Sequence, residues 1–255
     1  MIQILSEYEL DRMREAGKLV AKILVELEKF VKPGVSTKDL DDLAMKIIKE
    51  AGGSAPCLGY GRPPFPAAIC TSVNREVVHG IPSAKRILKD GDIVTCDVVA
   101  ELNGYNADAA RTFLVGNVDE ETKLLVERTK EAFFVGLKEV KIGNRIGDVS
   151  NAVQQYAESF GYGVVRELTG HGIGSEMHQD PDVPNYGKPG RGPRIQKGMA
   201  FCLEPMITMK SRAVDMLRDE WTIVTVDGAP AAHYENTIII TENGPEMTTI
   251  EEVLN

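Results

Sequence analysis

The stretch GDIVTCDVVAELNGYNADAARTFLV, residues 91–115, predicts two antiparallel strands joined by a tight turn. Asn103-Gly104 in its middle is a strong signal for a two-residue hairpin turn, and the segments on either side are rich in residues that favour strands. Pairing around this turn places Asp97 opposite Ala110, with Asp108 diagonal to Asp97 on the same face. Two carboxylates able to bind one cation are therefore expected to converge on one face of a sheet.

The second half of the chain repeats this arrangement of acids. In each half a strand-like apolar run ends in a carboxylate six residues after a glycine, and a second acid precedes a further strand-like run. The first pair is Asp97 with Asp108, and the second pair is Glu204 with Glu235. The sequence thus predicts that two equivalent halves bring four acids to a shared centre.

Helical periodicity also occurs twice, ahead of each pair of acids. Ser6 and Glu9 form a capping-box pattern before a helix expected to run to about Phe30, and a second helix is expected from Ser36 or Thr37 to Gly52-Gly53. The phrase at residues 31–34 returns at residues 140–143, after a helix expected over 120–140, and His-Gly-Ile occurs at 79–81 and 171–173. We interpret these echoes as an internal repeat in one domain, 1–255, with halves of about 1–118 and 119–255.

Composition excludes several classes of protein. A chain of 255 residues that is 43% hydrophobic can bury a large core, and a net charge of −9 argues against nucleic acid as the main ligand. Residues 1–14 resemble neither a signal peptide nor a membrane span, so cytoplasmic residence and no membrane contact are expected. The four cysteines form no Cys-x-x-Cys pair and should stay free thiols, which argues against a structural zinc site.

The four acids and one histidine form a candidate site for two divalent metal ions. A single acid on a strand more often protects a sheet edge, but buried acids in a repeated arrangement would each need a compensating partner. Four carboxylates balance the charge of two divalent cations. An oxygen-rich set with one histidine suits Mn(II), Fe(II) or Co(II) at least as well as Zn(II). The candidate ligands are Asp97, Asp108, His171, Glu204 and Glu235.

Three of the four histidines occur where a site is expected. His79 and His171 belong to the repeated His-Gly-Ile phrase, and His178 follows the glycine-rich run at 170–174. His233, two residues before Glu235, is equally consistent with a place beside the site and with the surface. The glycine run lacks the Lys-Ser/Thr of a phosphate loop and is better explained by close backbone approach to a metal.

Together these residues resemble the methionine aminopeptidases of type I, in the short bacterial form, over almost the whole chain. The segments that carry the resemblance are 78–82, Asp97, Asp108 with 111–113, 170–174, 177–178, 204–206 and 234–237. The resemblance implies an α/β pita-bread fold, in which two pseudo-twofold halves, each a helix pair with antiparallel strands, surround a dinuclear metal site. It also implies a hydrolase that removes the N-terminal methionine of nascent proteins and peptides.

The resemblance assigns a role to each candidate residue. Asp108 and Glu235 would bridge two ions (Co, Mn, Fe or Zn), Asp97 would complete one site, and His171 with Glu204 would complete the other. Glu204 would also move a proton, His79 would lie near the scissile amide nitrogen, and His178 would polarise the carbonyl. The residues matching the methionine pocket are Cys57, Tyr60, Phe65, Cys70, Met177 and Trp221, and this pocket implies a small second residue in the substrate.

Two other functions stay open on sequence grounds. One is a related pita-bread peptidase that cleaves before proline, although such enzymes usually carry a sizeable N-terminal domain. The other is a metal-free relative that serves as a binding protein. A monomer is the default expectation, and no specific DNA partner is expected. The basic residues of loop 188–197, Lys188, Arg191, Arg194 and Lys197, are consistent with a transient ribosome contact or with a solvated loop.

Overall fold

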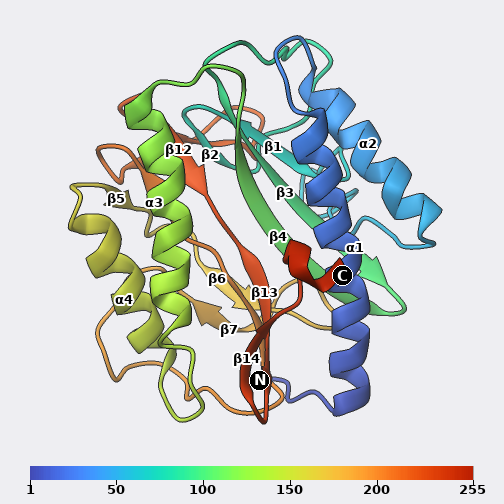
Figure 1. The fold of residues 1–255 in the computed structure, drawn as a ribbon, viewed down its shortest axis with the longest axis vertical. Coiled ribbons are helices and arrows are strands. Elements are labelled where there is room, and N and C mark those ends of the chain that lie inside the picture. The colour runs from blue at the N-terminus through green and yellow to red at the C-terminus, as the bar shows by residue number, and fades with distance from the viewer. Residues whose placement is uncertain (255) are drawn as a thin grey trace.

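The computed structural model describes residues 1–254, and two helix pairs pack against antiparallel strands in it (Figure 1). One pair, α1 and α2, lies on one side of the view, and the other pair, α3 and α4, lies on the opposite side. The helices are α1 (Glu7–Phe30), α2 (Thr37–Glu50), α3 (Glu120–Leu137) and α4 (Ile146–Glu158), followed by the 3-10 helix η1 (Glu251–Leu254). Within residues 1–254, no helix combines the length and the apolar character needed to span a membrane.

The strands form four small sheets, and one of these joins β2 of the first half to β10 and β11 of the second half. The orders are β1-β3-β4, β10-β11-β2, β12-β9-β5 and β14-β13-β8-β6-β7. The strands are β1 (Cys70–Val73), β2 (Glu76–Val78), β3 (Ile93–Leu102), β4 (Tyr105–Leu114), β5 (Gly163–Val164), β6 (Gly170–Gly172), β7 (Gln179–Val183), β8 (Ala200–Leu203), β9 (Met206–Thr208), β10 (Val214–Met216), β11 (Ile223–Thr225), β12 (Ala231–His233), β13 (Asn236–Thr241) and β14 (Gly244–Met247).

Side-chain caps begin the first helix pair where the sequence predicts. The backbone N–H of Ser6 donates to Glu9 Oε2 at 2.7 Å, and Ser36 N–H donates to Asp39 Oδ2 at 2.8 Å. Each N-cap hydroxyl accepts in return from the backbone of the same acid, so both ends are capping boxes. The predicted end of α1 at Phe30 and the predicted start of α2 are therefore confirmed.

The second helix pair follows the same plan with different caps. Asp119 accepts the Thr122 N–H at 3.0 Å at the start of α3, and Asp148 accepts the Arg145 N–H at 2.7 Å at the start of α4. The predicted third helix begins at Glu120 as expected but ends at Leu137, three residues before the expected end at 140. The turn that follows is the one that matches the turn between α1 and α2 in sequence.

The β3–β4 hairpin has the register that the sequence predicts. Asp97 pairs with Ala110 and Val99 pairs with Asp108, so the two acids are diagonal neighbours. Asn103 and Gly104 form the turn with φ of 54° and 85°, the positive values that a tight hairpin turn requires. Asp97 and Asp108 thus lie on one face of the sheet.

Three apolar clusters join the helices to these strands. One lies between the α1–α2 pair and β3–β4, and includes Ile23, Leu40 and Val94. A second lies between the α3–α4 pair and the strands β8 and β13, and includes Phe133 and Phe201. A third brings Leu10 and Met13 of α1 against Ile239 of β13, which joins the first helix to the second half of the chain. The segments that carry the four acids are thereby packed into one body.

Candidate metal centre and substrate pocket

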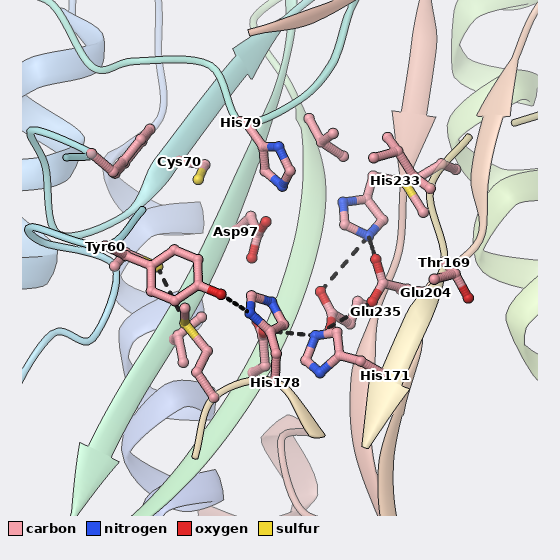
Figure 2. A pocket seen from close by; sticks show the side chains of 18 of the residues that line it. Tyr60, Cys70, His79, Asp97, Thr169, His171, His178, Glu204, His233 and Glu235 are labelled. Carbon is pink, nitrogen blue, oxygen red and sulfur yellow. Dashed lines mark hydrogen bonds and ion pairs between the residues drawn. The ribbon is translucent and has the colours of Figure 1, made fainter. Parts of the chain in front are cut away.

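The five candidate metal ligands line one cavity and come from five different segments. Figure 2 labels four of them, Asp97, His171, Glu204 and Glu235. Asp97 lies on β3, Asp108 on β4 and His171 on β6, while Glu204 follows β8 and Glu235 lies between β12 and β13. The cavity has a volume of about 520 Å³. All the other site residues predicted from the sequence also line it, namely Cys57, Tyr60, Phe65, Cys70, His79, Met177, His178 and Trp221.

His171 is oriented as a metal-binding imidazole. Its Nδ1 lies 3.0 Å from the carbonyl oxygen of Gly172, which can only accept, so Nδ1 carries the proton and Nε2 is left as a ligand atom. That Nε2 lies 3.6 Å from Asp108 Oδ2 and 3.6 Å from Glu204 Oε1. Two ligand atoms about 2.1 Å from one ion lie about 3 to 4 Å apart, so these separations suit a shared ion.

The buried carboxylate oxygens also fit a cation. Asp108 Oδ1, Glu204 Oε1 and Glu235 Oε1 are buried and have no hydrogen-bond partner within residues 1–254. Buried charged oxygens without partners are strongly unfavourable, and a bound cation satisfies several at once. Two overlapping groups of side chains are close enough to hold an ion, Asp108, His171, Cys202 and Glu235 in one and Asp97, His233 and Glu235 in the other.

The electrostatics of the cluster also favour a bound cation. Burial first, and neighbouring carboxylates second, raise the pKa of Asp97, Glu204 and Glu235 well above the ordinary carboxyl range. Without a cation these groups favour the protonated form because like charges cannot share a buried site cheaply. Burial also raises the pKa of the Cys202 thiol well above its ordinary value, so this residue is a core thiol rather than a thiolate ligand.

Hydrogen bonds between the two halves hold the acids in place. The Thr237 hydroxyl accepts from the Asp108 N–H and donates to the Asp108 carbonyl, both at 2.9 Å. The Arg111 guanidinium donates to the Glu235 carbonyl at 2.5 Å, and Glu235 N–H donates to the Ala110 carbonyl at 3.0 Å. These hydrogen bonds therefore hold the second acid of each half, Asp108 and Glu235, against the opposite half of the chain.

His79 projects into the cavity from an unusual backbone conformation. Its φ is +57°, a value that non-glycine residues rarely adopt, and its ring lies 6.2 Å from the Trp221 ring in an edge-to-face arrangement. Gly80 makes this possible because a Cβ there would lie 2.1 Å from the Thr71 carbonyl oxygen. Burial lowers the pKa of His79, so its imidazole is neutral near pH 7.

His178 lies on the other side of the cavity, at its exposed rim. Its Nδ1 is 3.0 Å from the Tyr60 hydroxyl, and its ring packs edge-on against His171 with the ring centres 4.3 Å apart. Partial desolvation, and then the nearby His171 ring, lower the pKa of His178 to about 4. The neutral ring can therefore donate a hydrogen bond to a substrate carbonyl.

The predicted methionine pocket forms the apolar end of the cavity. Phe65 and Trp221 pack edge-to-face with ring centres 5.2 Å apart, and Cys57 Sγ lies 3.9 Å from Met177 Sδ. Trp221 is held by a hydrogen bond from Nε1 to the Pro63 carbonyl at 3.0 Å. Aromatic and sulfur atoms of this kind make favourable contacts with an unbranched thioether.

His233 is the site residue that sequence reasoning left undecided. It is 1% exposed, lines the cavity and lies among the acids, so the alternative of a surface position is wrong. The spacing of His233 and Glu235 could have placed it. In an extended chain side chains two residues apart point the same way, so His233 is expected on the same side as Glu235.

Comparisons with known proteins agree with the geometry. The metallopeptidase family M24 matches residues 11–242. A methionine aminopeptidase from Clostridium acetobutylicum is 53% identical over 99% of this chain and 100% of its own length. The crystal structure of a methionine aminopeptidase from Thermotoga maritima superposes with a TM-score of 0.95 at 44% identity, covering 98% of this chain and 100% of that one.

A prolidase from Pyrococcus furiosus shares the fold alone. Its TM-score is 0.78 at 21% identity, and the match covers 96% of this chain but 65% of the prolidase. The expected pita-bread fold is confirmed by both kinds of relative. The chain therefore belongs to metallopeptidase family M24 and, within it, to the methionine aminopeptidases of the short type that its sequence predicts.

Proposed function

We propose that this protein hydrolyses the peptide bond after an N-terminal methionine, in peptides and in newly made proteins, with two divalent metal ions in its cavity. The observation that carries this proposal is the meeting of two surfaces in one cavity. One surface is the cluster of five candidate ligands, and the other is the apolar, sulfur-containing pocket beside it. An N-terminal methionine placed in the pocket has its scissile bond beside the carboxylates.

The ions would be held by the two pairs of acids and by His171. Asp108 and Glu235 would serve both ions, Asp97 one of them, and Glu204 with His171 the other. When bound, divalent ions supply Lewis-acid charge and make water a better nucleophile near neutral pH. The single imidazole among oxygen ligands favours Mn(II), Fe(II) or Co(II) over a structural type of zinc site.

The remaining steps belong to the chain's own groups. The Glu204 carboxylate takes a proton from the attacking water and returns it to the leaving amine nitrogen. His178 donates a hydrogen bond to the carbonyl oxygen of the scissile bond, where negative charge develops. His79 faces His178 across the cavity and lies at the amide nitrogen of the scissile bond. The pocket closes around His79, which restricts the second residue of the substrate to a small side chain.

A pair of peptides separates this function from cleavage before proline. We expect Met-Ala-Ser to be cleaved much faster than Ala-Pro-Ala by protein supplied with Mn(II) or Co(II), because the apolar, sulfur-containing pocket suits an unbranched thioether side chain. Release of free methionine and free alanine is measured by amino-acid analysis. Preference for the proline peptide would overturn the proposed substrate.

Replacing His79 tests its place at the scissile bond. His79→Ala is expected to lower kcat on Met-Ala-Ser by about 100-fold or more, as loss of a group that handles a proton or hydrogen bond in the transition state does. Bound metal should stay at the wild-type level because His79 is not among the ligands. Steady-state kinetics and elemental analysis of the same sample check this, and loss of metal would instead identify His79 as a ligand.

Further features of the proposal concern the protein in its cell. We propose a monomer whose whole length, 1–255, is one catalytic domain with two halves, working in the cytoplasm, where its four cysteines stay reduced. Loop 188–197 is the proposed ribosome contact. Lys197 of this loop pairs with Glu7 and Glu242, so Lys188, Arg191 and Arg194 supply the charge left for an RNA surface.

A further inference from the structure

His233 is buried among the acids of the metal centre, and its ring has no hydrogen-bond partner. It is the last residue of β12 and is 1% exposed, and neither Nδ1 nor Nε2 has a partner within residues 1–254. Its backbone is held on both sides by the Thr112 hydroxyl, at 2.9 and 3.0 Å. A polar ring held in a buried place without a partner is costly to folding, and this points to a functional reason for its presence.

Two of the acids lie near His233 Nε2 (Figure 2). Nε2 lies 3.8 Å from Glu204 Oε2 and 3.7 Å from Glu235 Oε2. A neutral imidazole carries a single N–H and can donate from one nitrogen only. The other oxygen of Glu204, Oε1, faces His171 at 3.6 Å. Glu204 therefore stands between two imidazoles, with one oxygen toward each.

Two roles are consistent with these separations, and one observation distinguishes them. As a ligand, His233 would share an ion with Asp97 and Glu235, which lie close enough. A ligating imidazole nearly always donates its other N–H to a carbonyl or carboxylate, as His171 does to Gly172 at 3.0 Å. Neither ring nitrogen of His233 has a hydrogen-bond partner within residues 1–254, but two carboxylate oxygens lie 3.7 and 3.8 Å from Nε2. This favours a ring that carries its proton on Nε2 and donates from there.

We propose that His233 is a positioning residue whose Nε2–H donates to Glu204 Oε2, so that Oε1 is presented to the cation and the carboxylate keeps the orientation in which it moves a proton. This inference rests on the proposed function of Glu204. A carboxylate bound through one oxygen is otherwise free to rotate, and a neighbouring donor that prevents rotation strengthens metal binding and preserves catalytic geometry.

Two substitutions at this position separate the hydrogen bond from the ring. His233→Leu removes the donor at similar volume, and we expect a loss of about 10- to 100-fold in kcat and in affinity for the first Mn(II), with the number of ions at saturation unchanged. His233→Gln places an amide N–H near the position of Nε2 and should restore both values toward those of the wild type. Calorimetric titration of metal-free protein measures affinity and stoichiometry without any reaction.

The control is Thr208→Val, which removes another buried hydrogen-bonding side chain from the sheet that contains β12. It should lower thermal stability and leave kcat and metal affinity unchanged. Wild-type kcat and affinity in His233→Leu would overturn the inference. Binding of one fewer ion at saturation would also overturn it, and so would equal losses in the Leu and Gln variants, because either result would make the ring a ligand. Failure of the wild type to cleave Met-Ala-Ser would reject the proposed function, while the titrations would still test His233.

Discussion

Glu204→Gln is expected to fold and to lose about 10²- to 10⁴-fold in kcat on Met-Ala-Ser, the range typical of a removed general acid–base group. Glutamine keeps the volume of the side chain, which is 8% exposed, but it has no charge and cannot accept the proton of the attacking water. One negative charge is also lost from the ligand set, so metal binding weakens. Kinetics at saturating Mn(II), with bound metal measured in parallel, separates the two effects.

A second buried carboxylate provides the control for Glu204→Gln. Asp41 on α2 is 4% exposed, and its Oδ1 accepts the N–H groups of Ala68 at 2.8 Å and Ile69 at 3.2 Å. Asp41→Asn removes a comparable charge away from the cavity and should lower stability while kcat stays at the wild-type value. If Glu204→Gln retains near-normal kcat with its metal bound, Glu204 is not the proton carrier.

Local signals made the acid-bearing hairpin predictable. Asn103-Gly104 specifies a tight turn, and the period of two along strands then determines that Asp97 and Asp108 share a face. The same reasoning, applied to both halves, predicted that Glu204 and Glu235 meet them. Such inferences succeed because side-chain direction in a strand depends only on its neighbours and on the turn.

The substrate pocket could not be built from local signals. Tyr60 and His178 are 118 residues apart in the chain and meet at 3.0 Å through two irregular loops. Trp221 comes from a third loop and lies against Gly61, where a Cβ would approach the ring to 2.6 Å. Loops carry no periodicity from which a contact can be derived, so only the resemblance to a family placed these residues together.

His233 shows a different limit. The sequence shows that His233 lies two residues before Glu235, which predicts that both side chains point the same way. The burial of the His233 ring depends instead on how β12 lies between β9 and β4. His233 pairs with Met206 across β9, and the Thr112 hydroxyl on β4 holds it from the other side. These neighbours belong to both halves of the chain, so the position of the ring follows from how the halves pack together, which the sequence pattern does not specify.

Removing the metal ions with a chelator is expected to abolish cleavage of Met-Ala-Ser and to lower thermal stability in a pH-dependent way. Each ion present at a hundredfold excess over its dissociation constant stabilises the folded state by about 2.7 kcal/mol, which corresponds to about 5 to 10 °C for a chain of this size. Activity should return on adding Mn(II), Fe(II) under anaerobic conditions, or Co(II). Scanning calorimetry and activity of the same samples test both effects.

The pH dependence follows from the acids of the metal-free cluster. Burial and mutual repulsion raise the pKa of Asp97, Glu204 and Glu235 in the folded protein above the ordinary value near 4 that they have when unfolded. At a pH between these values the folded chain binds more protons than the unfolded chain, so the stability of the metal-free protein falls as pH rises from about 4. Bound cations neutralise the carboxylates and remove this loss.

The stabilisation by metal should therefore be larger at about pH 8 than at about pH 5.5, because at the lower pH protons compete with the ions for the same oxygens. A variant that lacks one of the acids proposed to bridge the ions, Asp108→Ala, provides the comparison, since it should show little stabilisation by Mn(II) at either pH. Equal stabilisation at both values would contradict the assignment of the acids. Binding of less than one ion per chain, with no cleavage of Met-Ala-Ser after anaerobic loading, would favour the alternative function, a metal-free binding protein with the same fold.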